Sequence, residues 1–373
     1  MKKILFILIV ICAFSFSVSA KDIDVENELY ISSQATKMAD VANDSIKEFD
    51  FENLTKIIKT KNDLFKPKSI VTKILNTFFE EINHNLHVMF LLIVLSIIWG
   101  LVSNIQSSYN SKSVSQTAFF AFYPIFLGLI ISGLKECMEL AHTTISDQVL
   151  FMKVSIPVYT ALSMSSGNVA AATNMEPVFL YFIQLIGTFL EKFILQLVFW
   201  ISVLNMINCM TDKFSIKKLI DFIKQSIKWF LGIIMTLFIG ILSMSGIATS
   251  ITDGLGIKTL KFAVGNFIPV VGGLLSDSVS TVISSISILK NTLGIAGVIT
   301  IVLMCITPII KMISLIAIYK LAAGLVEPIC DKRITNMISE SGNALTFILL
   351  ILLSVTIMFI LGITITISLG SNY

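Results

Sequence analysis

The chain has 373 residues, of which 55% are apolar and 14% are charged, and its formal net charge is +3. Soluble proteins carry roughly 25% charged residues. This composition, with a mean hydropathy of +0.88, excludes an ordinary soluble domain and indicates an integral membrane protein. The small positive charge is spread along the chain, so no basic patch typical of nucleic-acid binding is visible.

The first twenty residues have the features of a secretion signal. Lys2 and Lys3 precede an apolar run at 4–16, and small residues lead up to Ala20. The run is too short and wrongly flanked to be a membrane anchor. We therefore expect cleavage after Ala20, which places the following residues on the outer side of the membrane.

Residues 21–87 have the most soluble composition, and we expect them to form an extracytoplasmic helical segment. After Pro67, apolar residues recur at every fourth position, namely Ile70, Ile74, Phe78, Ile82 and Leu86. This period predicts a helix. We expect it to lie on the membrane or on a partner before it enters the first span.

Uncharged runs approaching the roughly 20 residues that cross a bilayer recur through the rest of the chain. They predict an all-α polytopic membrane protein with about six transmembrane helices, in a range of about six to eight. The expected crossings, alternately inward and outward, are 88–105, 118–134, 177–211, 229–252, 292–326 and 344–369. Residues 135–176 and 253–291 then lie on the outer side or dip into the membrane as re-entrant or broken segments.

The segment 211–228 has the pattern of an interfacial helix on the cytoplasmic side. One helical face is apolar, and lysines flank it at Lys213, Lys217, Lys218, Lys224 and Lys228. These lysines either only enforce topology by the positive-inside rule or also recruit a cytoplasmic partner.

An internal duplication is expected in the second half of the chain. Ile156-Pro157-Val158 returns as Ile268-Pro269-Val270, and Asp212-Lys213 returns as Asp331-Lys332. Both basic segments are placed inside, so an even number of crossings separates them and the repeats are parallel. The organisation predicted is a signal at 1–20, an outer segment at 21–87, a first hairpin at 88–134, and repeats at 135–252 and 253–373.

Two polar motifs within the apolar chain are candidate elements of a pathway or helix breaks. The first contains Pro157, Ser166, Gly167, Asn168 and Asn174, and its counterpart contains Pro269, Gly272 and Gly273. Backbone groups freed at a helix break must be buried in protein or face water, which favours re-entrant or pore-lining segments. Close helix packing through small residues is the alternative.

Three charges interrupt long apolar stretches: Glu191 and Lys192 in the third span and Lys311 in the fifth. A charge at the bilayer centre costs roughly 2.5–3.5 kcal/mol on insertion scales, so it usually has a functional or structural role. We expect a buried functional or structural pairing. The alternatives are a turn in a tight hairpin or side chains that extend to the interface.

No motif in the sequence indicates an enzyme or a cofactor site. Glu80, His84 and His87 share a helical face and could in principle bind a metal ion. The sequence offers no further ligand beside them, so a solvated helix end is the simpler interpretation. No P-loop, G-x-S-x-G or H-E-x-x-H motif occurs. The cysteines of the mature chain have no C-x-x-C spacing and are expected to be small apolar fillers: Cys137, Cys209, Cys305 and Cys330.

Three motifs carry a resemblance to a known family. Ile156-Pro-Val is followed by Ser166-Gly167-Asn168 and an alanine-rich run, residues 267–273 read Phe-Ile-Pro-Val-Val-Gly-Gly before Asp277, and residues 290–298 read Lys-Asn-Thr-Leu-Gly-Ile-Ala-Gly-Val. In these motifs, and in its signal and polytopic body, the chain resembles the stage III sporulation protein AE family. The resemblance covers nearly the whole chain, although residues 1–60 carry no matching motif.

The resemblance implies a role in endospore formation. It implies a non-enzymatic core component of a secretion or feeding-channel apparatus, in the mother-cell membrane around the forespore. The implied partners are other stage III sporulation membrane proteins, their cytoplasmic ATPase and the forespore stage II sporulation protein Q. The competing hypothesis is a small-molecule transporter built from parallel repeats, in which the same polar motifs form a binding site at the membrane centre.

Overall fold

The computed structural model describes residues 37, 40–42, 67–108, 112–165, 169–210, 216–240 and 272–368. All regular secondary structure in these residues is helical. The elements are α4 (Pro67–Ser108), α5 (Lys112–Ser165), α6 (Val169–Phe189), a π-helical segment (Leu190–Ile194), α7 (Leu195–Met210), the helix Lys217–Gly240, α9 (Gly272–Val326) and α10 (Lys332–Ser368).

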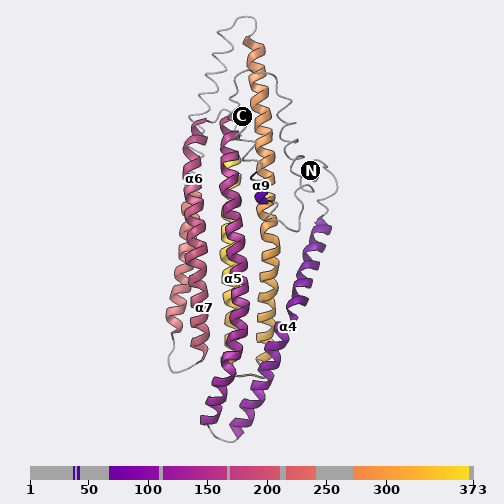
Figure 1. Cartoon of the computed structure of the whole chain (residues 1–373), viewed down its shortest axis with the longest axis vertical. Helices are drawn as coiled ribbons and strands as arrows, with labels where there is room; N and C mark the ends of the chain where they lie inside the picture. Colours follow the sequence, from indigo (N-terminus) through magenta and orange to yellow (C-terminus); the bar gives the residue numbers. More distant parts are fainter. Residues whose placement is uncertain are drawn as a thin grey trace.

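The helices lie side by side along one long axis (Figure 1). Successive helices run in opposite directions, except that α6, the π-helical segment and α7 form one continuous helix. At the turn between α9 and α10, the indole of Trp99 on α4 donates to the carboxylate of Asp331, at 3.2 Å. At the upper end, the hydroxyl of Tyr159 on α5 donates to the carbonyl of Leu293 on α9, at 3.2 Å. The bundle is therefore tied together across its length.

Six helices in the described part of the chain are long and apolar enough to cross a membrane, which confirms the predicted all-α polytopic fold. They comprise Leu75–Asn104, Ala118–Ser165, Pro177–Met210, Lys217–Gly240, Leu293–Val326 and Lys332–Thr364. A helix suits this setting because it satisfies its backbone hydrogen bonds internally. Among these six, α10 is the most buried and the helix Lys217–Gly240 the most exposed.

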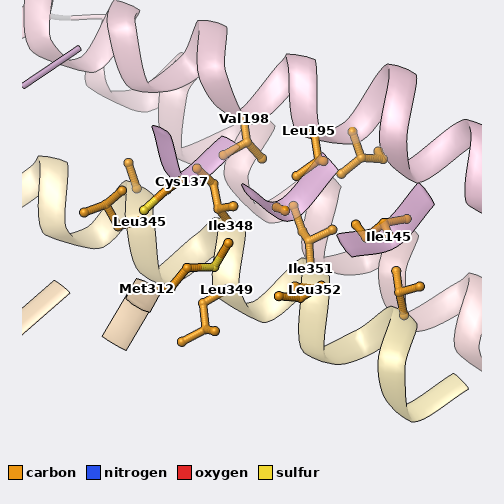
Figure 2. Packing of buried hydrophobic residues seen from close by; sticks show 14 of the residues in the cluster. Cys137, Ile145, Leu195, Val198, Met312, Leu345, Ile348, Leu349, Ile351 and Leu352 are labelled. Atoms are coloured by element: carbon orange, nitrogen blue, oxygen red, sulfur yellow. The ribbon is translucent and has the colours of Figure 1, made fainter. Parts of the chain in front are cut away.

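The centre of the bundle is packed by apolar side chains from four helices (Figure 2). Cys137 of α5, Val198 of α7 and Met312 of α9 surround the α10 residues Leu345 and Ile348. Lipid tails are as apolar as these side chains, so close dispersion contacts, and not removal from water, hold such helices together. The burial of Cys137 agrees with its expected role as a filler.

The helix boundaries agree only in part with the expected ones. The helix predicted to follow Pro67 begins at that residue, but it runs through the first span to Ser108 as one element. Helix α5 continues past the predicted end of the second span to Ser165 and includes Pro157, which is buried. The structure therefore places no helix break at Pro157. That residues 135–176 lie on the outer side of the membrane or dip into it stays a prediction.

The basic segment also differs from its prediction. Residues 217–228 are not a separate helix beside the span, because they form the first turns of the continuous helix Lys217–Gly240. A stack of Phe230 on Phe189, with ring centroids 5.4 Å apart, holds this helix to α6. Lys228 adds a contact over the ring of Phe347 on α10, at 5.5 Å.

Several predicted features lie outside the described residues. They are the signal with Ala20, the polar residues Ser166, Gly167 and Asn168, Pro269, and Lys213. Gly272 and Gly273 are the first two residues of α9, and Asn174 lies in the first turns of α6. The internal duplication stays a prediction.

Gly100 of α4 marks the closest approach of that helix to the turn between α9 and α10. A Cβ atom at this position would lie 2.6 Å from the backbone oxygen of Ile329. Such a backbone atom cannot rotate away as a side chain can. The absence of a side chain at Gly100 is therefore what allows Trp99 to reach Asp331.

We predict that Gly100→Ala lowers stability by about 1–3 kcal/mol, because overpacking forces the helices apart. The measurement is thermal unfolding of the purified protein in nanodiscs. Gly128→Ala is the matched control, since a Cβ at Gly128 meets nothing within 4 Å, and helix propensity should make that change neutral or slightly stabilising. Equal melting temperatures for both variants would contradict the close contact.

Candidate functional site

The most connected polar group in the described bundle is the carboxylate of Glu340, the single acidic residue of α10. It accepts hydrogen bonds from Asn205 of α7 at 2.6 Å, from Lys224 at 3.0 Å and from Asn343 at 3.1 Å. Lys320 of α9 donates in turn to Asn343. One carboxylate thus joins α7, the helix Lys217–Gly240, α9 and α10.

This network explains how an acidic residue is tolerated about two turns into α10. A charge inside a membrane protein is normally paired or faces water. Here the Glu340 carboxylate has both a cation and two amide donors, and the side chains of Lys224 and Glu340 are 25% and 34% exposed. Lys224 was predicted as part of a basic interfacial helix, but the structure gives it a partner on another span.

A second polar contact lies at the π-helical segment that joins α6 to α7. The backbone N–H of Leu195 donates to the carbonyl of Leu190, five residues earlier, which is the π-helical pattern. In this segment the carboxylate of Glu191 lies 3.0 Å from the imidazole Nε2 of His142 on α5. Helix 169–210 therefore runs through Glu191 without the hairpin turn considered above. The neighbouring Lys192 is exposed.

The third predicted charge also has a partner. Lys311 of α9 lies 3.5 Å from the carboxylate of Glu81 on α4, where the carboxylate is largely buried. The sequence alone did not identify Glu81, because it precedes the first apolar run and nothing in its surroundings indicates depth. The pairing expected for Glu191 and Lys311 is thus present, and each partner comes from a different helix.

A fully buried polar cluster lies higher in the bundle. Gln148 of α5 contacts the thiol of Cys305 on α9 and donates to the hydroxyl of Thr356 on α10, at 3.1 Å. Cys305 and Thr356 are themselves 3.0 Å apart. Within the described part of the chain, the amide oxygen of Gln148 has no hydrogen-bond partner. Sequence analysis missed this cluster because each residue is a single polar side chain in a separate apolar stretch.

The exposed face of α5 is polar in its middle section. We call this face the α5 stripe; its residues, all exposed, are Ser132, Lys135, Glu136, Glu139, His142, Thr143 and Ser146. Helical spacing brings them to one side, and Lys135 and Glu139 form an ion pair at 3.6 Å on it. At Ala121, Ile125 and Gly128 the same face is apolar or small.

The α5 stripe lies at the mid-height of the neighbouring spans. Gly133 contacts the hydroxyl of Tyr319 on α9, and Gln148 contacts Cys305, so the stripe lies beside the middle of the span Leu293–Val326. His142 likewise meets Glu191 near the middle of Pro177–Met210. At this height the π-helical segment exposes Phe193, and α9 exposes Ile313. Charges on an otherwise apolar surface indicate contact with water or with polar protein groups.

The described residues contain no group of three His, Cys, Asp or Glu side chains that could hold a metal ion. His84 and His87 lie on an exposed part of α4, where His87 contacts the carbonyl of His84. Burial raises the pKa of the Cys330 thiol, in the turn before α10, to about 11, so this thiol is not activated as a nucleophile. The chemistry of the described site is charge pairing and hydrogen bonding between helices.

Comparison with known proteins places these features in a family context. The family described as "Stage III sporulation protein AE" matches residues 49–370, which include every helix from α4 to α10. A protein of Bacillus subtilis (strain 168) named "Stage III sporulation protein AE" is 29% identical over 307 residues, covering 82% of this chain and 77% of the relative. No solved structure matches the chain.

We predict a measurable coupling between Lys224 and Glu340. In a double-mutant cycle of Lys224→Met and Glu340→Gln, unfolding in nanodiscs should give an interaction energy of about 0.5–2 kcal/mol. Lys218→Met replaces Lys224→Met in the control cycle, because Lys218 is exposed on the same helix. Additive effects in the Lys224 cycle would show that the ion pair contributes nothing to stability.

Proposed function

We infer, because the chain belongs to the stage III sporulation protein AE family, that it acts in endospore formation as a non-enzymatic, multi-pass membrane component. We propose that it is part of a secretion or feeding-channel apparatus that links the mother cell and the forespore. Its place would be the mother-cell membrane that surrounds the forespore. Its partners would be other stage III sporulation membrane proteins, their cytoplasmic ATPase and the forespore stage II sporulation protein Q.

The observation that carries the channel-component proposal is the α5 stripe. Isolated in lipid, a helix face bearing Lys135, Glu136 and Glu139 beside the middle of other spans would cost several kcal/mol, at roughly 2.5–3.5 kcal/mol per charge. A component of a larger membrane assembly avoids this cost, because its polar face borders a water-filled path or another subunit. The ion pairs and hydrogen bonds across the bundle support a framework role, since they join separate helices.

The proposal is tested by replacing the α5 stripe with apolar side chains in the native bacterium. With the chromosomal gene deleted, sporulation efficiency should fall by several orders of magnitude, and the wild-type gene should restore it. The variant Glu136→Leu/Glu139→Leu should insert normally but fail to restore sporulation, because leucine cannot replace the polar contacts of the stripe. Gln196→Leu is the control, since Gln196 is exposed on α7 outside the stripe.

Three results would contradict the proposal or a part of it. Normal sporulation of the deletion strain would remove the sporulation role itself. Normal sporulation of the double leucine variant, at wild-type membrane abundance, would show that the stripe faces lipid. The proteins that co-purify with the wild-type chain from sporulating cells identify its partners. If the ATPase and the other stage III proteins are absent among them, the partners named above are wrong.

A transporter remains the second candidate, and one observation favours it. The buried Gln148 has a free amide oxygen beside Cys305 and Thr356, and such a group in a bundle core is a typical contact for a small polar solute. Purified protein in liposomes separates the two functions. We predict no saturable, solute-specific uptake without partners. Uptake that disappears in Gln148→Leu but persists in Gln184→Leu, at an exposed position of α6, would support the transporter instead.

A further inference from the structure

A second exposed polar surface lies on the upper part of α4. We call it the α4 face; its residues, all exposed, are Asn76, Glu80, Asn83, His84 and His87. Farther along α4, the exposed side chains are apolar at Phe90 and Leu101. The α4 face and the α5 stripe are therefore both polar surfaces on helices whose remaining outer faces are apolar.

The α4 face and the α5 stripe lie at the same height in the bundle. Glu81, next to the α4 face, pairs with Lys311 of α9. Lys311 lies between Cys305 and Tyr319, the two α9 residues that contact α5 at the ends of the stripe. Both surfaces thus lie beside the same stretch of α9.

Within one copy, these two surfaces do not cover each other. Helices α4 and α5 meet in their lower parts. There the ring centroids of Trp99 and Phe119 are 5.4 Å apart. Above that contact the two helices diverge, and α9 lies between them (Figure 1). The residues of both surfaces are exposed in the single chain.

We propose that copies of this chain associate side by side in the membrane, with the α5 stripe of one copy against the α4 face of the next. Copies inserted by the same route share one orientation, so only surfaces at equal height can meet. The contact uses two different surfaces, and such head-to-tail contacts build a ring when the rotation closes. This inference deepens the proposed function, since it names a second copy as a partner within the apparatus.

The two surfaces offer complementary hydrogen-bond donors and acceptors. The α5 stripe offers the carboxylates of Glu136 and Glu139 and the ammonium of Lys135, while the α4 face offers the imidazoles of His84 and His87 and the carboxylate of Glu80. An imidazole N–H donates to a carboxylate in either protonation state. By the α9 reference, Glu81 lies level with the stretch of α5 midway between Gly133 and Gln148. His84, about one turn lower on α4, therefore lies level with Glu139.

Disulfide cross-linking between two differently tagged copies tests the contact. One copy carries His84→Cys and the other Glu136→Cys, in a functional background from which these cysteines are removed: Cys137, Cys209, Cys305 and Cys330. Mild oxidation of membranes should give a linked dimer that carries both tags. Phe193→Cys replaces Glu136→Cys in the control, because Phe193 is exposed at a similar height on the π-helical segment, away from the α5 stripe.

A charge exchange gives a second, independent measurement. Glu139→Lys should lower the co-purification of the two tagged copies by about tenfold or more, because lysine cannot accept the N–H of His84, and adding His84→Glu should restore it. Membrane abundance is measured in the same samples, so that a folding defect is recognised. Failure of the exchange to restore association at normal abundance would overturn the pairing of these two residues.

The outcomes separate this inference from the proposed function. Cross-linking only in the His84–Glu136 pair supports the contact between copies. Absence of cross-linking, or equal cross-linking through Phe193, overturns it. If the double leucine variant of the stripe nevertheless abolishes sporulation, the proposed function stands and the stripe contacts a different subunit.

Discussion

The structure depends on one constraint, which is that a charge at membrane depth needs a partner inside the protein. Glu340 meets it most completely, with donors from Asn205, Lys224 and Asn343. Because those donors come from separate helices, satisfying the carboxylate also fixes how the helices pack. Glu191 and Lys311 act in the same way at greater height, through His142 and Glu81. Hydrophobic burial cannot provide this specificity, since lipid offers the same apolar surroundings.

The α5 stripe follows from the relative heights of the helices. The turn before α10 packs beside Trp99, well before the end of α4, and the lower ends of α4 and α5 project beyond the other helices (Figure 1). The uncharged part of α5 therefore lies below the middle of the neighbouring helices. The charged middle section of α5 lies beside the centres of the spans Pro177–Met210 and Leu293–Val326. A single chain therefore presents charges where its neighbours present apolar side chains, which is how a subunit of a larger membrane assembly differs from a self-contained protein.

Much of the candidate site was visible as isolated residues but not as contacts. Glu191, Lys192 and Lys311 stood out because a charge within an apolar run is expensive, and two of them have partners in the described structure. The partners themselves were not predictable, since Glu81 and His142 lie outside the apolar runs assigned to spans. Lys224 was recognised for its basic surroundings, whereas its pairing with Glu340, 116 residues away, required the packed bundle.

The sequence by itself determined the membrane class, the helical fold, six spans and the helix start at Pro67, because hydropathy and helical period are local properties. It also determined the family, through motifs that need no fold to be recognised. Only the tertiary structure decided that α5 continues through Pro157, that the basic segment belongs to the helix Lys217–Gly240, and which charges pair. The reason is that helix length at membrane depth and ion pairing both depend on neighbouring helices, and no local pattern records which helix will lie beside which.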